Sequence, residues 1–502
     1  MTSNVLMVQG TSSSAGKSLL VTALCRIFAR RGVKVAPFKA QNMSNNAGVC
    51  ADGAEIGRAQ ITQAMAAGIE PTAAMNPVLL KPEANVRSQV IVMGKAWKTL
   101  SARNYFERKQ HLWDHVTAAL DGLREEYDLV IIEGAGSPAE LNLKKGDIVN
   151  MAVARYANAP VLLVGDIDRG GIFPQLIGTK WLLPADEQAL IKGFVVNKFR
   201  GDPTLFYDGV SILEEKGEVP VLGVIPWVKD LAIPEEDAVA LDAQVFMQGE
   251  TQVDIAIIKL PRVSNFDDFD PLQREVGVRV RWVDSAEKLQ SPDAIIIPGT
   301  KSTIADLRWL HESGLADQIA AFGMNGGAVV GICGGYQMLG QVVRDPDLVE
   351  SSELEIDGVC LLPVETDFVG SKATYRAAAT LDVDIAWLAG LRGTKVTGYE
   401  IHMGRTSGAS NWLTIDERSQ ETVSVADGSI SADGKIWGCY LHGLFANDAL
   451  RRAWLGSLGW ENRSDAGGID LDAEFDKLAD AVEAALDMTL LEQIVANQQD
   501  GQ

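Results

Sequence analysis

The sequence predicts an α/β protein of two domains, each a mainly parallel sheet flanked by helices. Short apolar segments alternate with amphipathic ones from residue 4 to residue 226, and a second set of such segments begins near residue 252. Strands that are separated by helices indicate parallel sheets with both faces covered. Between the two sets, residues 233–251 are acidic and lack a strong strand pattern, which is typical of a linker.

The first domain is expected to cover residues 1–235. NVLMVQG predicts a buried strand, and KSLLVTALCRIFARRG predicts a helix that ends at Gly32. Further buried strands are predicted at KVAPFKA, DLVIIEG, APVLLVGD, LIKGFVVNKF and VPVLGVIP. Ligands bind at the carboxyl ends of the strands in open parallel sheets, so the polar residues that follow these segments mark the expected site.

The second domain is expected to cover residues 252–448, after a linker at 236–251. Its predicted strands are VDIAIIKLP, VRVRWVD, DAIIIPGT, GAVVGIC, KVTGYEIHMG and KIWGCYLHGLF. Residues 449–502 contain an amphipathic helical tail, LDAEFDKLADAVEAALDMTLLEQIVAN, which we expect to pack on the second domain.

The composition excludes several classes of partner. The 502 residues carry a formal net charge of −22, which argues against general binding of nucleic acid or anionic membranes. The start of the chain lacks a signal-peptide pattern, and no stretch is apolar enough to predict a membrane span. The five cysteines are scattered and form no C-x-x-C pair, which fits reduced thiols and gives no zinc pattern. We expect a cytoplasmic protein whose oligomeric state the sequence leaves open.

The stretch VQGTSSSAGKSLL has the features of a phosphate-binding loop. A buried strand leads into it, Gly10 and Gly16 allow close backbone approach, and a helix starts at its end. Lys17 would reach the outer phosphates of ATP, and the hydroxyl of Ser18 would bind Mg²⁺. A serine-rich turn that caps a helix is the alternative interpretation.

Five residues separate the two glycines of this loop, one more than the usual spacing. GTSSSAGKS resembles the dethiobiotin synthetase loop, including Thr11. The related partitioning ATPases carry a second lysine early in the loop, where this sequence has Ser12. The resemblance also implies that Asn197, in VVNKF, contacts adenine; a plain turn asparagine is the other interpretation.

Three more residues are candidates for the first site. Glu133 follows a strand in VIIEGAGS, where a carboxylate linked to Mg²⁺ is expected, although an acidic helix cap would look similar. Lys39 ends the second strand and is predicted to hold the substrate carboxylate or the transferred phosphoryl group; the alternative is a solvated surface lysine. Glu55, in DGAEIGRAQ, is a further candidate metal ligand.

The stretch GAVVGICGGYQMLG predicts a nucleophilic thiol. Cys333 follows an apolar segment, lies beside glycine and precedes a predicted helix. Such a strained turn exposes the sulfur, and the start of the helix favours the thiolate. The amide of Gly334 would bind an oxyanion, with a second donor from the IIIPGTKST segment around Gly299. A buried structural thiol is the alternative.

The thiol requires a base, and the chain contains five histidines. His442 ends a strand in GCYLHGLF and is the preferred general base. His402, in YEIHMGRT, is a candidate for orientation or binding. His111, His115 and His311 fit helix surfaces.

GICGGYQ followed by a late histidine resembles the class I glutamine amidotransferases. The resemblance implies that Cys333 attacks the glutamine amide, that His442 moves the proton, and that Gln337 contacts the substrate. One position departs from the family pattern. The family glutamate that orients the histidine lies two residues after it, and this chain has Leu444 there. The third member of the triad is therefore absent or comes from elsewhere.

The two halves together resemble the corrin-amidating enzymes, namely the cobyric acid synthase family and the cobyrinic acid a,c-diamide synthases. The segments that favour the cobyric acid synthase family are PFKAQNMSNN, MNPVLLKP, EGAGSPAELNL, GDIDRGGIF, VVNKFRGD, PGTKST, YEIHMG and YLHGLF. They extend from near residue 9 to about residue 447, which is close to a full-length resemblance.

The resemblance implies a cobalamin-biosynthesis ligase. It would amidate the b, d, e and g carboxylates of (adenosyl)cobyrinic acid a,c-diamide to give cobyric acid, with glutamine as nitrogen source and ATP with Mg²⁺ forming acyl phosphates. The corrinoid would be a substrate, and no tightly bound cofactor is expected. The a,c-diamide synthase is the alternative. A nucleotide-switch protein with an inactive glutaminase remnant is disfavoured by Ser12 and by the intact pair of Cys333 and His442.

Overall fold

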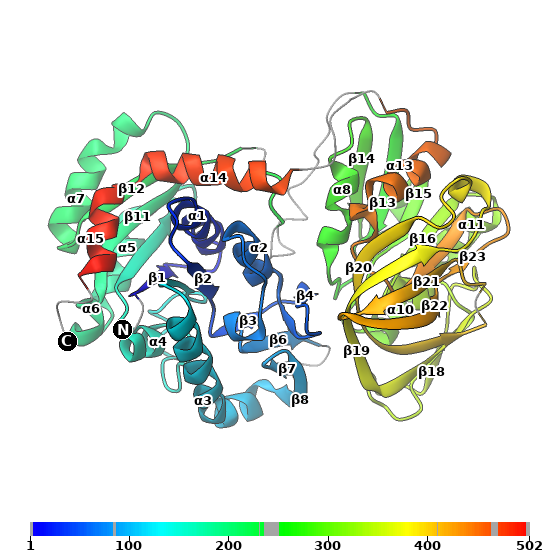
Figure 1. Ribbon diagram of the computed structural model, residues 1–502, viewed down its shortest axis with the longest axis horizontal. Coiled ribbons are helices and arrows are strands. Elements are labelled where there is room, and N and C mark those ends of the chain that lie inside the picture. The colour runs from blue at the N-terminus through cyan, green and yellow to red at the C-terminus, as the bar shows by residue number, and fades with distance from the viewer. Residues whose placement is uncertain are drawn as a thin grey trace.

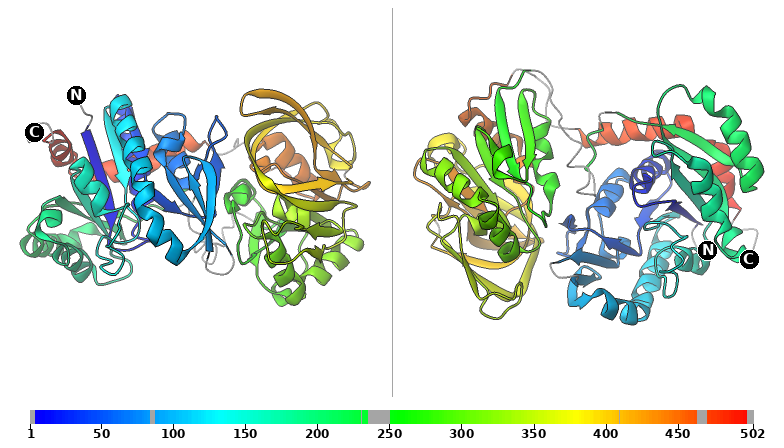
Figure 2. Two further views of the ribbon diagram at one scale, coloured as in Figure 1. Left: turned by 90° about the horizontal axis from the view of Figure 1, so that it is seen from below. Right: turned by 180° about the vertical axis from the view of Figure 1, so that it is seen from behind.

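The structure is a computed structural model that describes residues 4–83, 87–229, 231–234, 250–408, 410–462 and 470–497. Two α/β units lie side by side along the long axis (Figure 1), and the views from below and behind show the same separation (Figure 2). The predicted linker at 236–251 lies outside the described residues apart from residues 250 and 251. Within the described ranges, no helix combines the length and apolar character needed to cross a membrane.

The first unit is built on a parallel sheet of six strands in the order β12-β11-β10-β1-β9-β2. The strands are β1 (Asn4–Gly10), β2 (Val35–Phe38), β9 (Leu129–Glu133), β10 (Val161–Asp166), β11 (Ile191–Phe199) and β12 (Val221–Pro226). Every one of them was predicted from the sequence. Their near-continuous apolar residues are explained by burial on both faces.

Alternate residues of β1 point to opposite faces of this sheet. Val5 and Met7 belong to one hydrophobic core, and Leu6 and Val8 belong to another. The helices of the unit are α1 (Lys17–Arg30), α2 (Arg58–Ala66), α3 (Ala102–Glu126), α4 (Met151–Ala157), α5 (Ile172–Trp181), α6 (Ala185–Gln188) and α7 (Tyr207–Gly217), with short turns η1 (Ala73–Met75) and η2 (Pro203–Phe206).

Two small sheets extend the first unit toward the second (Figure 1). They were not predicted from the sequence. One has the order β3-β6-β7-β8, and the other is the antiparallel pair of β4 and β5. Their strands are β3 (Gln41–Met43), β4 (Ala47–Val49), β5 (Glu55–Gly57), β6 (Val78–Pro82), β7 (Arg87–Val92) and β8 (Lys95–Ser101).

The second unit contains a six-stranded sheet with the order β14-β13-β15-β16-β24-β23, parallel except for its last pair. Its strands are β13 (Val253–Ile258), β14 (Val278–Val283), β15 (Ala294–Ile297), β16 (Ala328–Ile332), β23 (Ser429–Ile430) and β24 (Ile436–Cys439). Its helical elements are η4 (Phe266–Phe269), α8 (Asp270–Gln273), α9 (Ala286–Leu289), α10 (Thr303–Glu312), α11 (Leu315–Met324), α12 (Gly334–Met338), η5 (Ala386–Leu388), η6 (Leu444–Ala446) and α13 (Asp448–Ser457).

A mainly antiparallel sheet covers part of the second unit. Its order is β18-β17-β19-β21-β22, and β20 also pairs with β19. The strands are β17 (Val342–Arg344), β18 (Glu355–Asp357), β19 (Glu365–Leu381), β20 (Lys395–Ser407), β21 (Leu413–Arg418) and β22 (Glu421–Asp427). Only β20 among these was predicted.

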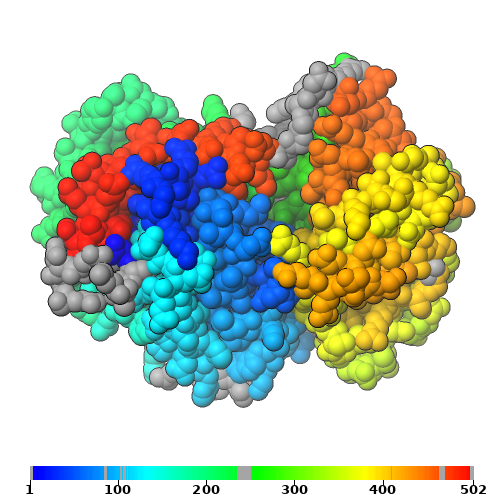
Figure 3. Space-filling view, in the orientation of Figure 1, coloured from blue at the N-terminus to red at the C-terminus, as the bar shows by residue number. Residues whose placement is uncertain are grey.

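The structure corrects the expected packing of the C-terminal tail. Helix α13 packs in the second unit through Leu450 and Trp454, but α14 (Leu471–Ala485) and α15 (Met488–Ala496) cross back to the first unit. Phe475 joins the core that contains Leu6, and Arg26 of α1 forms an ion pair with Asp476 at 2.8 Å. In Figure 3 these C-terminal helices, drawn in red, lie against the dark-blue start of the chain. The prediction that the tail packs on the second unit is therefore wrong for α14 and α15.

Candidate functional site

The predicted phosphate loop joins β1 to α1. Gly16 is the residue before the helix and has φ of 89°, a left-handed conformation that favours glycine. A Cβ at this position would lie 2.1 Å from Nδ2 of Asn197, which donates a hydrogen bond to the carbonyl of Ala15 at 2.9 Å. Asn197 therefore packs directly over the loop, and Gly16 is required for that contact.

The side chain of Lys17 curls over the loop. Its Nζ donates hydrogen bonds to the carbonyl oxygens of Ser12 and Ser13 at 2.9 and 3.2 Å. A Cβ at Gly10 would lie 3.0 Å from the same Nζ, so that glycine leaves room for the ammonium group. Thr11 donates to Oε1 of Gln175 at 3.1 Å, which ties the loop to α5.

Glu133 lies at the centre of the polar cluster beside this loop and is 1% exposed. Its Oε1 accepts hydrogen bonds from Ser18 at 2.8 Å and from Lys39 at 2.9 Å. Its Oε2 accepts one from Gln63 of α2 at 2.6 Å. Burial alone would raise the pKa of Glu133, but the charge and hydrogen bond of Lys39 and the hydrogen bond of Gln63 lower it. The carboxylate is thus held ionised.

Ser18 and Glu133 together offer a hydroxyl and a carboxylate oxygen at one point of the site. Hard oxygen ligands of this kind fit Mg²⁺, which takes few protein ligands and completes its shell with substrate phosphates and water. Across the described residues, no group of three or more His, Cys, Asp or Glu side chains is placed to hold a metal ion. Ser18 and Glu133 offer two oxygen ligands that such a cation could use.

Glu55, the other predicted metal ligand, is held by different partners. Its Oε1 accepts from Lys81 at 2.8 Å, and its Oε2 accepts from Lys372 of the second unit. Burial alone would raise the pKa of Glu55, but the two ammonium groups lower it to about 2. The structure thus places Glu55 in an ion cluster between the units, with Lys81 and Lys372 as its partners.

Cys333 comes directly after β16 and before the short helix α12. Its φ of 51° and ψ of −108° are strained for a residue with a side chain. The turn is tightly packed, since a Cβ at Gly335 would lie only 1.9 Å from the carbonyl oxygen of Ile297. The structure therefore explains the glycines beside the cysteine as the means of bringing α12 against β15.

His442 lies between Asp268 and Cys333. Its Nδ1 is 2.6 Å from Oδ2 of Asp268, whose Oδ1 accepts a hydrogen bond from the amide of Gly443 at 2.9 Å. Burial alone would lower the pKa of His442, but the charges of Asp268 and Cys333 and hydrogen bonds to both raise it to about 10. A protonated imidazole placed in this way stabilises negative charge on the sulfur.

The glycines predicted to bind an oxyanion lie beside this pair. A Cβ at Gly334 would be 3.2 Å from the amide nitrogen of Thr300, so these two backbone segments are neighbours. A Cβ at Gly299 would be 2.9 Å from Cε1 of His442, so Gly299 leaves room for the imidazole. The two segments predicted to supply the oxyanion donors therefore lie next to each other, beside the imidazole.

A cavity of about 60 Å³ contains Cys333, His442 and Gln337 in its lining. Gln337 is 2% exposed; its Oε1 accepts from Thr303 at 2.9 Å and its Nε2 donates to Tyr440 at 3.2 Å. Lys81 of the first unit also lines the cavity, so the thiol site opens toward the boundary between the units.

Two family models match the chain in succession. Residues 6–239 match the CobQ/CobB/MinD/ParA nucleotide binding domain, and residues 254–450 match the CobB/CobQ-like glutamine amidotransferase domain. A protein named cobyric acid synthase from Chloroflexus aurantiacus is 55% identical over 99% of this chain and 100% of its own length. The chain belongs to the cobyric acid synthase family.

Further proteins with the name cobyric acid synthase agree. Identity is 56% with that of Chloroflexus aggregans, over 98% of this chain and 99% of the relative, and 53% with that of Roseiflexus castenholzii, over 97% and 98%. These matches do not favour the a,c-diamide synthase alternative. Among solved structures, PurLQS from Thermotoga maritima aligns with 42% of this chain and 99% of its own, at 16% identity and a TM-score of 0.32, and adds nothing to the assignment.

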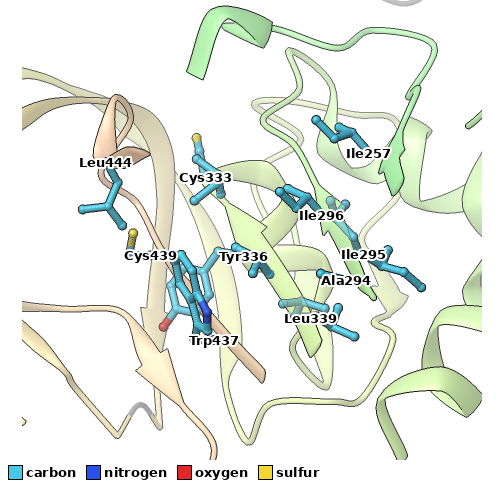
Figure 4. Close-up of a cluster of buried hydrophobic side chains, with 14 of the residues drawn as sticks. Ile257, Ala294, Ile295, Ile296, Cys333, Tyr336, Leu339, Trp437, Cys439 and Leu444 are labelled. Carbon is cyan, nitrogen blue, oxygen red and sulfur yellow. The ribbon is translucent and has the colours of Figure 1, made fainter. Parts of the chain in front are cut away.

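In this member of the cobyric acid synthase family, the residue that orients the histidine was missed by sequence reasoning. Leu444 is 1% exposed and belongs to the same buried cluster as Cys333 (Figure 4). Asp268 takes the orienting position from the turn η4, far upstream in the sequence. The acidic cluster NFDDFD after β13 was the available signal, because a strand end of the same sheet precedes it.

His402 has different partners from those of His442. Its Nε2 is 3.3 Å from Oε1 of Glu400, and its ring stacks on Tyr440 at a centroid distance of 3.8 Å. It lines the thiol cavity together with His442. This placement suits the binding or orientation predicted for it. His111, His115 and His311 are exposed on helices.

Proposed function

We propose that this chain converts (adenosyl)cobyrinic acid a,c-diamide to cobyric acid, a step of cobalamin biosynthesis, by amidating the b, d, e and g carboxylates. Glutamine supplies nitrogen and ATP activates each carboxylate. The observation that carries the proposal is the combination in one chain of a phosphate loop beside an ionised Glu133 and a thiol paired with His442 and Asp268. The similarity to relatives named cobyric acid synthase supports the choice of substrate.

At the thiol site, the sulfur of Cys333 attacks the side-chain amide carbon of glutamine. The amides of Gly334 and Thr300 stabilise the oxyanion that forms. His442 donates its proton to the departing nitrogen, which leaves as ammonia, and Asp268 keeps the imidazole oriented during the transfer. Water then attacks the glutamyl thioester, which releases glutamate and regenerates the thiol.

At the phosphate loop, a carboxylate oxygen of the corrinoid attacks the γ-phosphorus of ATP. The bond to the β-γ bridging oxygen breaks, so that ADP and an acyl phosphate form. Lys17 and the loop amides stabilise charge on the transferred phosphoryl group. Mg²⁺, held by Ser18 and Glu133, would supply further charge neutralisation. Ammonia then displaces phosphate at the acyl carbon and gives the amide.

Two other residues have proposed roles in the first site. Lys39 keeps Glu133 ionised through its 2.9 Å ion pair and contacts the phosphoryl group or the substrate carboxylate. Asn197, which covers the loop, contacts the adenine base. Glutamine, ATP and the corrinoid are substrates of the reaction, and we place it in the cytoplasm, where ATP occurs with reduced thiols.

The deciding experiment incubates the protein with ATP, Mg²⁺, glutamine and adenosylcobyrinic acid a,c-diamide and follows the corrinoid mass over time. We expect four successive amidations with matching release of glutamate and ADP. A parallel reaction with cobyrinic acid tests the related a,c-diamide activity. Amidation confined to the a and c positions of that second substrate would overturn the proposal.

A further inference from the structure

We propose that Arg58, at the start of helix α2 in the first unit, is a positioning residue for His442 in the second unit. The inference rests on the proposed role of His442 as the proton carrier of glutamine hydrolysis. Arg58 is not among the described residues that line the thiol cavity. It acts through Tyr399, which contacts the histidine, and through Asp267, which precedes the orienting carboxylate.

The first of these residues is Tyr399 of β20. The Nη2 of Arg58 donates a hydrogen bond to the hydroxyl of Tyr399 at 2.6 Å, and the guanidinium lies 5.1 Å from the centroid of the same ring. The side chain of Arg58 is only 15% exposed. A buried guanidinium that both donates to the hydroxyl and lies near the ring fixes the position of the tyrosine more firmly than either contact alone.

Tyr399 in turn contacts His442 along both its backbone and its ring. The amide of His442 donates to the carbonyl of Tyr399 at 2.9 Å, and the reverse bond measures 3.2 Å. The two rings are stacked with centroids 5.1 Å apart and planes 12° from parallel. Since Gly299 contacts the edge of the imidazole at Cε1, Tyr399 supplies the face against which the imidazole lies.

The second contact of Arg58 is with the turn η4, which carries the orienting carboxylate. The Nε of Arg58 is 2.9 Å from Oδ2 of Asp267, an ion pair without the alignment of a hydrogen bond. Asp267 directly precedes Asp268 in the chain. Arg58 therefore balances a buried negative charge beside the carboxylate that bonds to His442.

The hairpin of β4 and β5 in the first unit positions the side chain of Arg58. The amide of Arg58 donates to the carbonyl of Asn46, and a Cβ at Gly48 of β4 would lie 3.1 Å from its Nη1. The amide of Ala47 donates to Oδ1 of Asn265, one residue before η4, at 3.1 Å. The hairpin of β4 and β5 thus holds both Arg58 and the turn that it contacts. The planar guanidinium reaches the tyrosine and the aspartate through two separate nitrogens, Nη2 and Nε, whereas the ammonium of a lysine would have to serve both from one nitrogen.

The test compares glutamine hydrolysis with amidation driven by added ammonia, in the full chain. For Arg58→Met we expect the kcat of glutamine hydrolysis to fall roughly 10- to 100-fold, because a misplaced proton carrier reacts slowly. The KM for glutamine and the ammonia-driven rate should stay close to their original values. Arg58→Lys should recover part of the lost kcat. Arg344→Met is the control, since it removes a 2.7 Å ion pair with Glu365 between β17 and β19 of the second unit, and it should change neither rate.

A double-mutant cycle with Tyr399→Phe decides the route of the effect. If Arg58 acts through Tyr399, the double variant should lose less kcat for glutamine hydrolysis than the two single variants would lose if their effects added. Additive losses, or a loss of ammonia-driven amidation alone, would overturn the proposal. If Arg58→Met does not fold, the comparison of Tyr399→Phe with Arg58→Lys decides, and unchanged kcat in both refutes it. A failure of the proposed function is distinguishable, because the original protein would then hydrolyse no glutamine.

Discussion

The Nδ1 atom of His442 lies 2.6 Å from Oδ2 of Asp268, although 174 positions separate the two residues in the sequence. Asp268 comes from the turn after β13, and His442 follows β24 in the same sheet. The contact completes a Cys-His-Asp arrangement in a chain whose expected orienting position holds an apolar residue.

Replacing Asp268 with asparagine should separate the two half-reactions. We expect glutamine hydrolysis to fall by about 10²- to 10⁴-fold, because the imidazole loses the partner that fixes its orientation and stabilises its charge. Ammonia-driven amidation should be unaffected. Glutamate release and corrinoid amidation, measured on the same preparation, check both parts, and equal loss of the two rates would contradict the assignment.

Asp268→Asn should also change how the free energy of unfolding depends on pH. The pKa of His442 is raised from 6.5 to about 10 in the folded protein, so protonation of His442 stabilises the fold fully below about pH 6.5. That contribution is lost as the pH rises through about 10. Asp268→Asn lowers the pKa of His442, so the gap in unfolding free energy between the two proteins should shrink with rising pH. Urea unfolding at several pH values between 6.5 and about 10 measures this gap. A gap that widens over that range would refute the role of Asp268 as the partner of His442.

Cys333→Ala should abolish the use of glutamine and leave amidation with added ammonia. In the proposed mechanism the sulfur is the only protein atom that forms a covalent bond to glutamine, so we expect no remaining glutamine hydrolysis without it. Cys360→Ala is the control, since Cys360 is an exposed free cysteine. Loss of both activities in a folded Cys333→Ala protein would contradict the role of Cys333 as the nucleophile for glutamine.

Glu133→Gln should weaken the dependence of the first site on Mg²⁺. The substitution removes a charge that Ser18 and Lys39 both contact, and we expect apparent Mg²⁺ affinity to fall about 10- to 100-fold. Titration of ammonia-driven amidation with Mg²⁺ measures this. Glu140→Gln alters an exposed glutamate of the following loop and should leave the titration unchanged. Identical curves for Glu133→Gln and the original protein would exclude a metal role.

Gly335→Ala should destabilise the second unit. The new methyl group would lie 1.9 Å from the Ile297 carbonyl oxygen, and such overpacking costs about 1–3 kcal/mol or more. Gly456, in helix α13, has nothing within 4 Å of an added Cβ. Gly456→Ala should therefore be neutral or stabilise the protein by up to about 1 kcal/mol. Thermal unfolding of the two variants compares them, and similar melting temperatures would contradict the close approach.

The contacts of helix α2 with both sites indicate that the rate of glutamine hydrolysis depends on bound nucleotide. One of its residues, Arg58, contacts Tyr399, and another, Gln63, donates to Glu133 at 2.6 Å. We expect ATP with Mg²⁺ to change the rate of glutamine hydrolysis about fivefold or more, and Gln63→Leu to reduce this ratio toward one. Met65→Ala, on a more exposed part of the helix, is the control. An undiminished ratio in Gln63→Leu would show that α2 does not transmit the signal.

Local sequence patterns predicted the parts of this molecule whose structure depends on residues close together in the sequence. The apolar strands of both parallel sheets, the loop before α1 and the turn at Cys333 each depend on neighbouring residues, and the structure contains all of them. Asp268 could not be assigned in that way, because its partner is set by the order of strands in the sheet. The ion cluster of Glu55 with Lys372 depends on contact between the two units, which no local pattern encodes.

The return of α14 and α15 to the first unit has a consequence for synthesis on the ribosome. Phe475, Leu478 and Val482 cover apolar side chains of the first sheet and of α1, so one face of that unit lacks its cover until the last part of the chain is made. The second unit is translated in the meantime and can acquire its own core first. The unit that begins the chain can therefore complete its core only after α14 and α15 are made, and a polypeptide ended after α13 should expose that face and aggregate.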